Sequence, residues 1–296
     1  MANLLLIGIN GTLGSALARE ASNRRIAWEG TSRRENSRWR VDLAEPEETW
    51  NLPPKSKVAI ICSAITNIDE CENNPVQSRK INVDSTIRLI DRLASLGTNI
   101  VFLSSTRVFP PTFEHPSEFS TPAPATEYGR HKFDVEQYII RNHPDAKIIR
   151  PAKIIYSHLP LILAWKQTLS SNCQVKPYHN LHLSPIDLSH VVDAVLQISF
   201  GRHSGIFHLA ASDAISYVDL AFFLVKQFGY NTRLIQPIPA PYPNTMASTI
   251  LKCDWTIKNS SFSPRSSEDY LKAAFGQKMH TTSMTGHLPL PCPQPS

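Results

Sequence analysis

The 296-residue sequence has no long hydrophobic run, no paired cysteine motif and few glycines. No stretch approaches the roughly 20 apolar residues that a membrane-spanning helix needs. The apolar run at residues 4–7 has no basic segment before it, so we do not expect a signal peptide. The 5 cysteines are odd in number and widely spaced, and no CxxC pair occurs, so we predict neither a disulfide framework nor a metal site. These absences favour a soluble protein of the reducing cytoplasm, with no membrane partner.

Charge is modest and scattered. The formal net charge is +5, and 19% of the residues are charged against 42% hydrophobic, as in an ordinary folded protein. Basic residues are scattered along the chain, apart from pairs such as Arg24-Arg25 and Arg33-Arg34. A nucleic-acid-binding surface is normally denser in positive charge, so the sequence favours a small anionic ligand and no nucleic-acid partner.

Short apolar runs alternate with amphipathic segments through the first 155 residues, which is typical of βαβ units around a buried parallel sheet. The predicted strands are residues 4–8, 26–31, 58–63, 100–104 and 146–150, and the predicted helices are 12–23, about 75–96 and about 126–143. After Pro151 the pattern is looser, with clear helices only at 191–199 and 217–228. The predicted fold class is α/β, a Rossmann-type doubly wound parallel sheet with a smaller C-terminal α/β substrate domain.

The predicted organisation has three parts. Residues 1–155 form a dinucleotide-binding domain, and residues 156–276 form mainly the substrate domain, with segments that return to the Rossmann sheet. Residues 277–296 are rich in Thr, Ser and Pro, so they are expected to be disordered.

Three of the 11 glycines follow the first predicted strand, as Gly8, Gly11 and Gly14. Glycines at such a turn let backbone amides at a helix N-terminus approach a pyrophosphate. The spacing is GxxGxxG, one residue longer in its first interval than the GxGxxG fingerprint. A purely structural turn is the alternative, but its position between the first strand and first helix favours dinucleotide binding.

The tip of the second predicted strand selects between cofactors. An acid there would bind the ribose diol of NAD, whereas a basic residue would bind the 2′-phosphate of NADP. The sequence has Ser32-Arg33-Arg34, and Glu29 lies too early to serve as that acid. NADPH is therefore favoured over NAD, and a solvated arginine pair is the alternative.

Tyr128 and Lys132 stand four residues apart and so share one helix face. A carbonyl that receives hydride needs a proton donor and a hydrogen bond to its oxygen. Tyr128 would donate the proton, with its pKa lowered by the Lys132 ammonium, which can also reach the nicotinamide ribose. Ser105, at the end of the fourth predicted strand, would hold the oxygen, and Ser104 is the adjacent alternative. The predicted catalytic residues are Ser105, Tyr128 and Lys132.

The glycine loop, the strand-end serine and the YxxxK pair occur in the order and at the separations of the extended short-chain dehydrogenase/reductase superfamily, which the chain closely resembles. The segments 64–75, 81–83, 103–109, 149–151, 184–194 and 205–210 are similar to its dTDP-4-dehydrorhamnose reductase branch. The resemblance covers about residues 2–275. It implies a reductase that takes NADPH and a keto group on a nucleotide-activated sugar, and it leaves a homodimer open.

The resemblance, together with the glycine loop and the strand tip, gives the expected cofactor contacts. Asp42 in this set would meet the adenine. The set is Gly8, Asn10, Gly11, Thr12, Leu13, Gly14, Ser32, Arg33, Arg34, Asp42, Leu43, Cys62, Ser63, Ala64, Tyr128 and Lys132.

Departures from the family pattern concern the substrate. Thr106 and Arg107 replace an Asp-Tyr pair, and Pro110-Pro111 replace Asp-Gly, at positions that border the substrate cleft. Two other functions therefore stay open: a sugar-nucleotide epimerase or dehydratase, and a non-catalytic regulatory protein of the same fold, like the regulatory subunit of methionine adenosyltransferase.

Three further segments have simple interpretations. His131 is expected to be an exposed helix residue, and Trp165 to pack rather than stack on a base. The proline-rich segment 110–126 is interpreted either as a mobile lid over the substrate or as a surface connection.

Overall fold

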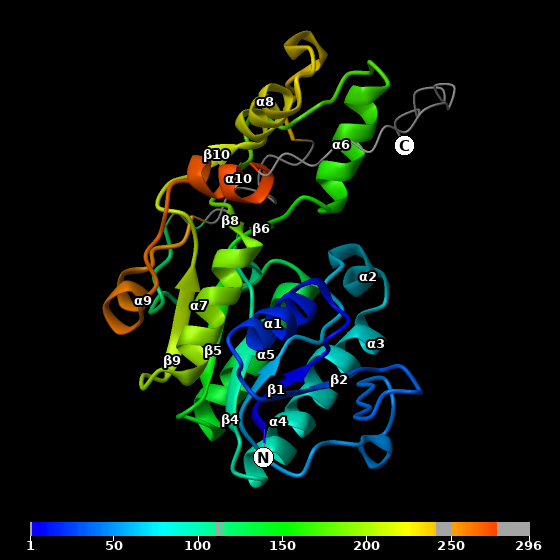
Figure 1. Cartoon of the computed structure of the whole chain (residues 1–296), viewed down its shortest axis with the longest axis vertical. Coiled ribbons are helices and arrows are strands. Elements are labelled where there is room, and N and C mark those ends of the chain that lie inside the picture. The colour runs from blue at the N-terminus through cyan, green and yellow to red at the C-terminus, as the bar shows by residue number, and fades with distance from the viewer. Residues whose placement is uncertain (1, 111–112, 114, 241–249, 277–296) are drawn as a thin grey trace.

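The computed structural model describes residues 2–110, 113, 115–240 and 250–276; the tail predicted at 277–296 lies outside them. Six parallel strands form the central sheet in the order β2-β1-β3-β4-β5-β9 (Figure 1). Their bounds are β1 Ala2–Ile7, β2 Trp28–Thr31, β3 Ser56–Ile61, β4 Asn99–Leu103, β5 Lys147–Pro151 and β9 Gly205–Leu209. The predicted α/β class with a parallel sheet is confirmed.

Helices cover both faces of the sheet because the strand side chains alternate between two apolar layers. Leu4 and Leu6 pack with helices α1 (Thr12–Asn23) and α7 (Leu188–Phe200). Leu5 and Ile7 pack on the opposite face with α4 (Thr86–Ser95) and α5 (Glu127–Asn142). All four strand side chains are at most 1% exposed, and burying each contributes about 1.5–3 kcal/mol. The continuous apolar run of a parallel strand follows from this two-sided burial.

The strand order reverses at β1, which has β2 on one side and β3 on the other. A crevice opens at such a reversal beyond the carboxyl ends of the strands, and ligands of open α/β sheets bind there. Beyond β2 the chain forms only an isolated parallel bridge between Ser32 and Arg40. The glycine turn after β1 and the Arg33-Arg34 tip after β2 therefore lie at the same edge.

The five predicted strands are all present, with ends displaced by one or two residues. The helix predicted at about 75–96 consists of α3 (Pro75–Arg79), a π-helical segment η2 (Lys80–Ser85) and α4, in unbroken succession. The short helix α2 (Ile68–Asn73), which the sequence pattern did not predict, begins where the Asn67 side chain accepts a hydrogen bond from the Glu70 amide. Three 3₁₀ turns complete this part and the second lobe: η1 Glu47–Thr49, η3 Thr106–Val108 and η4 Thr232–Leu234.

A smaller lobe stands beyond the carboxyl edge of the sheet, with α6, α8 and α10 at its centre (Figure 1). Its elements are β6 Ile154–Ile155, α6 Pro160–Ser170, β7 His182–Leu183, β8 Ile186–Asp187, β10 Ile215–Ser216, α8 Tyr217–Phe228 and α10 Ser267–Phe275. Helix α8 has the bounds predicted for it, because a capping box of Ser216 and Asp219 begins it and left-handed Gly229 ends it. Trp165 packs, half-buried, in the apolar clusters of this lobe.

Segments from the second half of the chain return to the sheet. Helix α7 lies against α1, and β9 pairs with β5 to form the edge of the sheet. The short helix α9 (Asp254–Asn259) packs beside β9. Among the described residues, no helix is long and apolar enough to cross a membrane.

Candidate active site

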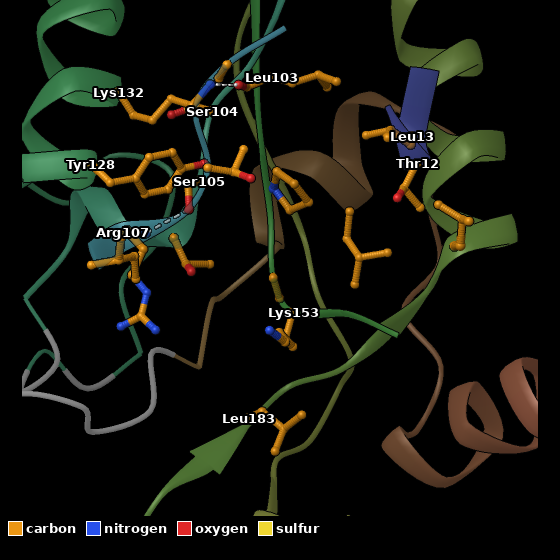
Figure 2. Close-up of a pocket in the computed structure, with 18 of the residues that line it drawn as sticks. Thr12, Leu13, Leu103, Ser104, Ser105, Arg107, Tyr128, Lys132, Lys153 and Leu183 are labelled. Carbon is orange, nitrogen blue, oxygen red and sulfur yellow. Dashed lines mark hydrogen bonds between the residues drawn. The ribbon is translucent and has the colours of Figure 1, made fainter. Parts of the chain in front are cut away.

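A cavity of about 560 Å³ lies between the carboxyl edge of the sheet and the smaller lobe. The turn after β1, the ends of β3 and β4, and helix α5 form one wall; residues of β6 and β7 and Tyr217 form the other. Figure 2 shows the Tyr128–Ser105 pair on one side and Thr12 and Leu13 on the other. Of the predicted site residues, those that line the cavity are Gly11, Thr12, Leu13, Gly14, Cys62, Ala64, Ser105, Tyr128 and Lys132.

In the glycine turn, Gly8 and Gly14 leave no room for a side chain, whereas Gly11 does. Gly8 has a φ of +89°, and a Cβ at Gly14 would stand 2.3 Å from the Gly8 carbonyl oxygen. A Cβ at Gly11 would meet nothing nearer than 3.7 Å. Gly11 is the N-cap of α1, and within the described part of the chain no side chain accepts from the first amides of that helix. An uncapped N-terminus facing a cavity fits a pyrophosphate.

The tip of β2 has two arginines without a side-chain partner among the described residues. Arg33 and Arg34 are exposed, and no ion pair or side-chain hydrogen bond involves either guanidinium. The Ser32 hydroxyl accepts hydrogen bonds from the Arg34 amide (3.1 Å) and from Asn10 Nδ2 (2.7 Å). The turn after β1 is thus fastened to the tip of β2.

The other basic groups nearby are paired with acids. Arg40 donates two hydrogen bonds to Glu45, and Arg38 lies 3.5 Å from Glu29. Glu29 also accepts a hydrogen bond from Trp39 Nε1 (2.9 Å). The Glu29 carboxylate is therefore engaged by Trp39 and Arg38.

Several predicted cofactor contacts lie outside the cavity lining. The Asp42 carboxylate accepts from the Ala44 amide at 3.0 Å, and the Leu43 side chain is buried in the core beneath the sheet. Ser63 lies against Gly8, where a Cβ on the glycine would come within 2.2 Å of the Ser63 hydroxyl. Cys62 lines the cavity as a free thiol whose pKa burial raises to about 12.

The two serines after β4 point in different directions, as successive residues of an extended chain do. Ser104 is buried and donates to the Glu136 carboxylate, which also forms an ion pair with Arg150. Ser105 faces the cavity beside Tyr128, where its hydroxyl accepts from the Arg107 amide (3.2 Å) and acts to lower the pKa of the Tyr128 phenol. The structure therefore favours Ser105 over Ser104 as the hydroxyl available to a ligand.

Tyr128 and Lys132 lie on one face of α5, but they do not interact as predicted. Burial raises the pKa of Tyr128 to about 12, and only the Ser105 hydroxyl and the Arg107 charge oppose this rise. The Lys132 ammonium donates to the Leu103 carbonyl oxygen (2.8 Å), and burial lowers its pKa to about 8. The expectation that the pKa of Tyr128 is lowered is wrong for this structure, because burial of the phenol raises it; the Lys132 ammonium is bound to the strand-end carbonyl, 5.9 Å from the phenol ring centre.

His131 corrects another expectation, since its side chain is only 1% exposed. Helix α5 packs against α2 and the π-helical segment, so the face that was expected to meet solvent is covered. Nδ1 of His131 lies 3.5 Å from Asn82 Nδ2, and burial lowers the pKa of the imidazole.

The described part of the proline-rich segment is anchored to the rest of the molecule. Glu118 is 2% exposed and accepts from both the amide and the hydroxyl of Thr256. The Pro116 carbonyl oxygen accepts from the Lys252 amide at 2.9 Å. Of the two interpretations, residues 115–126 fit a surface connection.

Sequence reasoning missed the residues that the smaller lobe contributes to the cavity. These include Lys153, Tyr156, His182 and Tyr217. Lys153 carried a weak signal, since it follows the end of a predicted strand at the ligand-binding edge. Tyr156 and His182 come from short or irregular segments, and Tyr217 is the first residue of α8, so no period indicates that these side chains face a ligand.

The whole described fold and the cavity lie within one family match. The family model described as RmlD substrate binding domain covers residues 1–275. The chain belongs to this family. The predicted membership in the dTDP-4-dehydrorhamnose reductase branch is thereby confirmed, and with it the assignment to NAD(P)-dependent oxidoreductases of the short-chain dehydrogenase/reductase type.

The relatives of this RmlD-family chain include a reductase and a subunit of a methionine adenosyltransferase. It is 22% identical over 303 residues to the dTDP-4-dehydrorhamnose reductase of Mycobacterium tuberculosis, with 97% of this chain and 96% of the relative covered. It is 23% identical over 250 residues to methionine adenosyltransferase 2 subunit beta of Rattus norvegicus, with 79% and 75% covered.

Solved structures share the fold at low sequence identity. The dTDP-4-dehydrorhamnose reductase of Bacillus anthracis, in complex with NADP, matches with a TM-score of 0.81, 18% identity, and coverage of 93% of this chain and 98% of that one. MoeE5, in complex with UDP-glucose and NAD, matches with a TM-score of 0.78, 18% identity and the same coverage.

Proposed function

We propose that this protein reduces a keto group on a nucleotide-activated sugar, with NADPH as the hydride donor. The observation that carries the proposal is that Ser105 and Tyr128 lie side by side in the cavity that the N-terminus of α1 also lines (Figure 2). One side of the cavity thus suits a dinucleotide, and the other suits a carbonyl oxygen. Membership in the RmlD family supports the same reaction.

The cofactor-binding residues fit NADPH. The open amides after Gly11 would hold the pyrophosphate, and Arg33 and Arg34 would hold the 2′-phosphate with their free guanidinium groups. The bound nicotinamide would supply hydride. Neutral Arg33→Met and Arg34→Met substitutions should weaken NADPH binding by about tenfold or more, with little effect on NADH, because only NADPH has the 2′-phosphate.

The catalytic residues act on the substrate oxygen. With its pKa near 12, Tyr128 carries its proton at neutral pH and can donate it as charge develops on the carbonyl oxygen. Ser105 would donate a hydrogen bond to the same oxygen. The Lys132 ammonium donates one hydrogen bond to the Leu103 carbonyl oxygen. Its other N–H groups would donate to the nicotinamide ribose.

The test is NADPH consumption with a panel of 4-keto nucleotide sugars, comparing the natural protein with Tyr128→Phe. We expect Tyr128→Phe to lower kcat by about 10²–10⁴-fold while the Kd of NADPH stays within about threefold. Unchanged turnover in Tyr128→Phe would sink the assigned acid. Tighter binding of NADH than of NADPH would refute the role of Arg33 and Arg34.

A non-catalytic cofactor-binding regulator is the second candidate. It is favoured by the altered 106–107 segment and by the similarity to methionine adenosyltransferase 2 subunit beta. NADPH binding with no turnover of any 4-keto nucleotide sugar would support this candidate. An epimerase or dehydratase would instead convert the sugar without net consumption of NADPH.

A further inference from the structure

We propose that Arg107 and Lys153 form a two-cation site that binds an anionic group of the substrate beside the Ser105–Tyr128 pair. Both residues line the cavity, one from each wall. This inference deepens the proposed function, on which it rests for the nature of the substrate as a sugar nucleotide.

Arg107 lies close to the reacting end of the cavity. Its amide donates to Ser105 Oγ (3.2 Å), and its positive charge lowers the pKa of Tyr128. The same charge also acts on Tyr217 and Lys153, which belong to the opposite wall. Arg107 and Lys153 both line the cavity, and Figure 2 shows the Arg107 guanidinium to the left of the Lys153 ammonium, at about the same height.

Lys153 reaches the same space from the strand end after β5. Its backbone is fixed, because its carbonyl oxygen accepts from the Ile186 amide at 3.0 Å between β6 and β8. The side chain is open to the cavity, yet the surrounding walls and the Arg107 charge lower the pKa of its ammonium. Two like charges thus share a partly desolvated space.

Neither cation has a compensating acid among the described residues. No Asp or Glu lines the cavity, and no ion pair involves Arg107 or Lys153. Other arginines of the chain are paired, such as the buried Arg150 with Glu136 and the half-exposed Arg79 with Asp134. Two unpaired cations in one cleft repel each other, and an anionic ligand would relieve this repulsion.

The ligand chemistry is a planar or tetrahedral oxyanion. A guanidinium binds such groups with two parallel hydrogen bonds, and an ammonium adds a point charge from the other side. In a sugar nucleotide this anion is either the diphosphate or a carboxylate on the sugar. If the site binds the diphosphate, a nucleotide with a neutral sugar should bind as well as one with an acidic sugar. If the site binds a sugar carboxylate, the nucleotide with the acidic sugar should bind more tightly.

The experiment measures the Kd of UDP-glucose, UDP-glucuronic acid, dTDP-glucose and dTDP by calorimetry, with and without saturating NADPH. The variants are Arg107→Met, Lys153→Met and the double variant, which remove charge and keep side-chain length. Arg107→Lys retains the charge. Lys258→Met, on the exposed face of α9 and outside the cavity lining, is the matched control.

We expect each single neutral variant to weaken nucleotide-sugar binding by about tenfold or more, Arg107→Lys to weaken it less, and Lys258→Met to leave it unchanged. Equal weakening for UDP-glucose and UDP-glucuronic acid assigns the site to the diphosphate. Selective weakening for UDP-glucuronic acid assigns it to a sugar carboxylate.

Two results would overturn the proposal: no binding of any probe by the natural protein, or unchanged Kd values in the double variant. NADPH affinity is measured separately in every variant. Charge-dependent sugar-nucleotide binding without NADPH binding or turnover would refute the proposed reductase function and leave the anion site standing.

Discussion

At the scale of single residues, neighbours in the sequence have different tasks. Ser104 and Ser105 both line the cavity, but the Ser104 hydroxyl donates to the buried Glu136 carboxylate, whereas the Ser105 hydroxyl accepts from the Arg107 amide. Under the proposed function, Ser105→Ala should lower kcat by about 10²-fold, because it removes a hydrogen bond to the developing oxyanion. Steady-state kinetics check this.

Ser104→Ala is the control for that prediction. It leaves kcat within about threefold and instead lowers the free energy of unfolding, since the Glu136 carboxylate loses a buried donor. A larger loss of kcat in Ser104→Ala than in Ser105→Ala would contradict the assignment.

Lys132 gives a pH-dependent prediction. Its folded-state pKa of about 8 lies below the ordinary 10.5, so between these values the unfolded chain binds more protons than the folded one. Stability from this group therefore rises with pH in that window, by at most about 1.4 kcal/mol per pH unit. We expect the natural protein to gain stability relative to Lys132→Met between pH 8 and 10, measured by urea unfolding. A constant difference would show that the ammonium is not desolvated.

At the scale of elements, the π-helical segment η2 positions the loop after β3. Asn82 in this segment bonds the Ile65 amide (2.8 Å) and the Ile65 carbonyl oxygen (2.9 Å), and the loop that it holds includes the cavity residues Ala64 and Thr66. π-Helical turns are often found next to functional sites. The wider π-helical turn places the buried side-chain amide of Asn82 against the backbone of the loop.

Asn82→Leu keeps the volume of the side chain but leaves both Ile65 groups without their partner. We expect a loss of about 2–4 kcal/mol in the free energy of unfolding, and weaker NADPH binding, because the loop loses its anchor. Urea unfolding and NADPH titration measure the two effects. Asp84→Asn, exposed in the same segment, is the control and should change stability by less than about 0.5 kcal/mol. Equal effects of the two variants would refute the positioning role.

At the scale of the whole molecule, Thr256 connects three segments that are far apart in the sequence. Its hydroxyl donates to Glu118 and accepts from the His208 amide of β9, and all three residues are at most 2% exposed. The segment around Thr256 is thus hydrogen-bonded to β9 of the sheet and to the connection that follows β4.

Thr256→Val, nearly isosteric, should cost about 2–4 kcal/mol of unfolding free energy, because the His208 amide and one Glu118 bond are left unsatisfied inside the protein. Thermal and urea unfolding check this. Thr168→Val is the matched control, since that hydroxyl bonds only within α6. A cost below about 0.5 kcal/mol for Thr256→Val would show that the tether contributes little.

The sequence predicted the sheet, its main helices and the placing of Tyr128 and Lys132 on one helix, because each depends on local periodicity or spacing. It missed the burial of His131, because the sequence of the largely polar helix α5 does not indicate that the π-helical segment packs over this residue. It also misjudged the effect of Lys132 on Tyr128, because the acceptor of the ammonium is a backbone carbonyl, which no side-chain motif reveals.

By itself, the sequence determined the α/β class, the glycine turn at the first strand and the shared helix face of Tyr128 and Lys132, because alternation and helical spacing are properties of neighbouring residues. Only the tertiary structure decided which serine hydroxyl is bound to the buried Glu136 carboxylate, where the Lys132 ammonium lies, and that Arg107 and Lys153 share one cleft. Those outcomes depend on contacts between segments that are far apart in the sequence. Burial and nearby charges in such contacts change the pKa values of side chains, and neighbouring residues in the sequence do not reveal them.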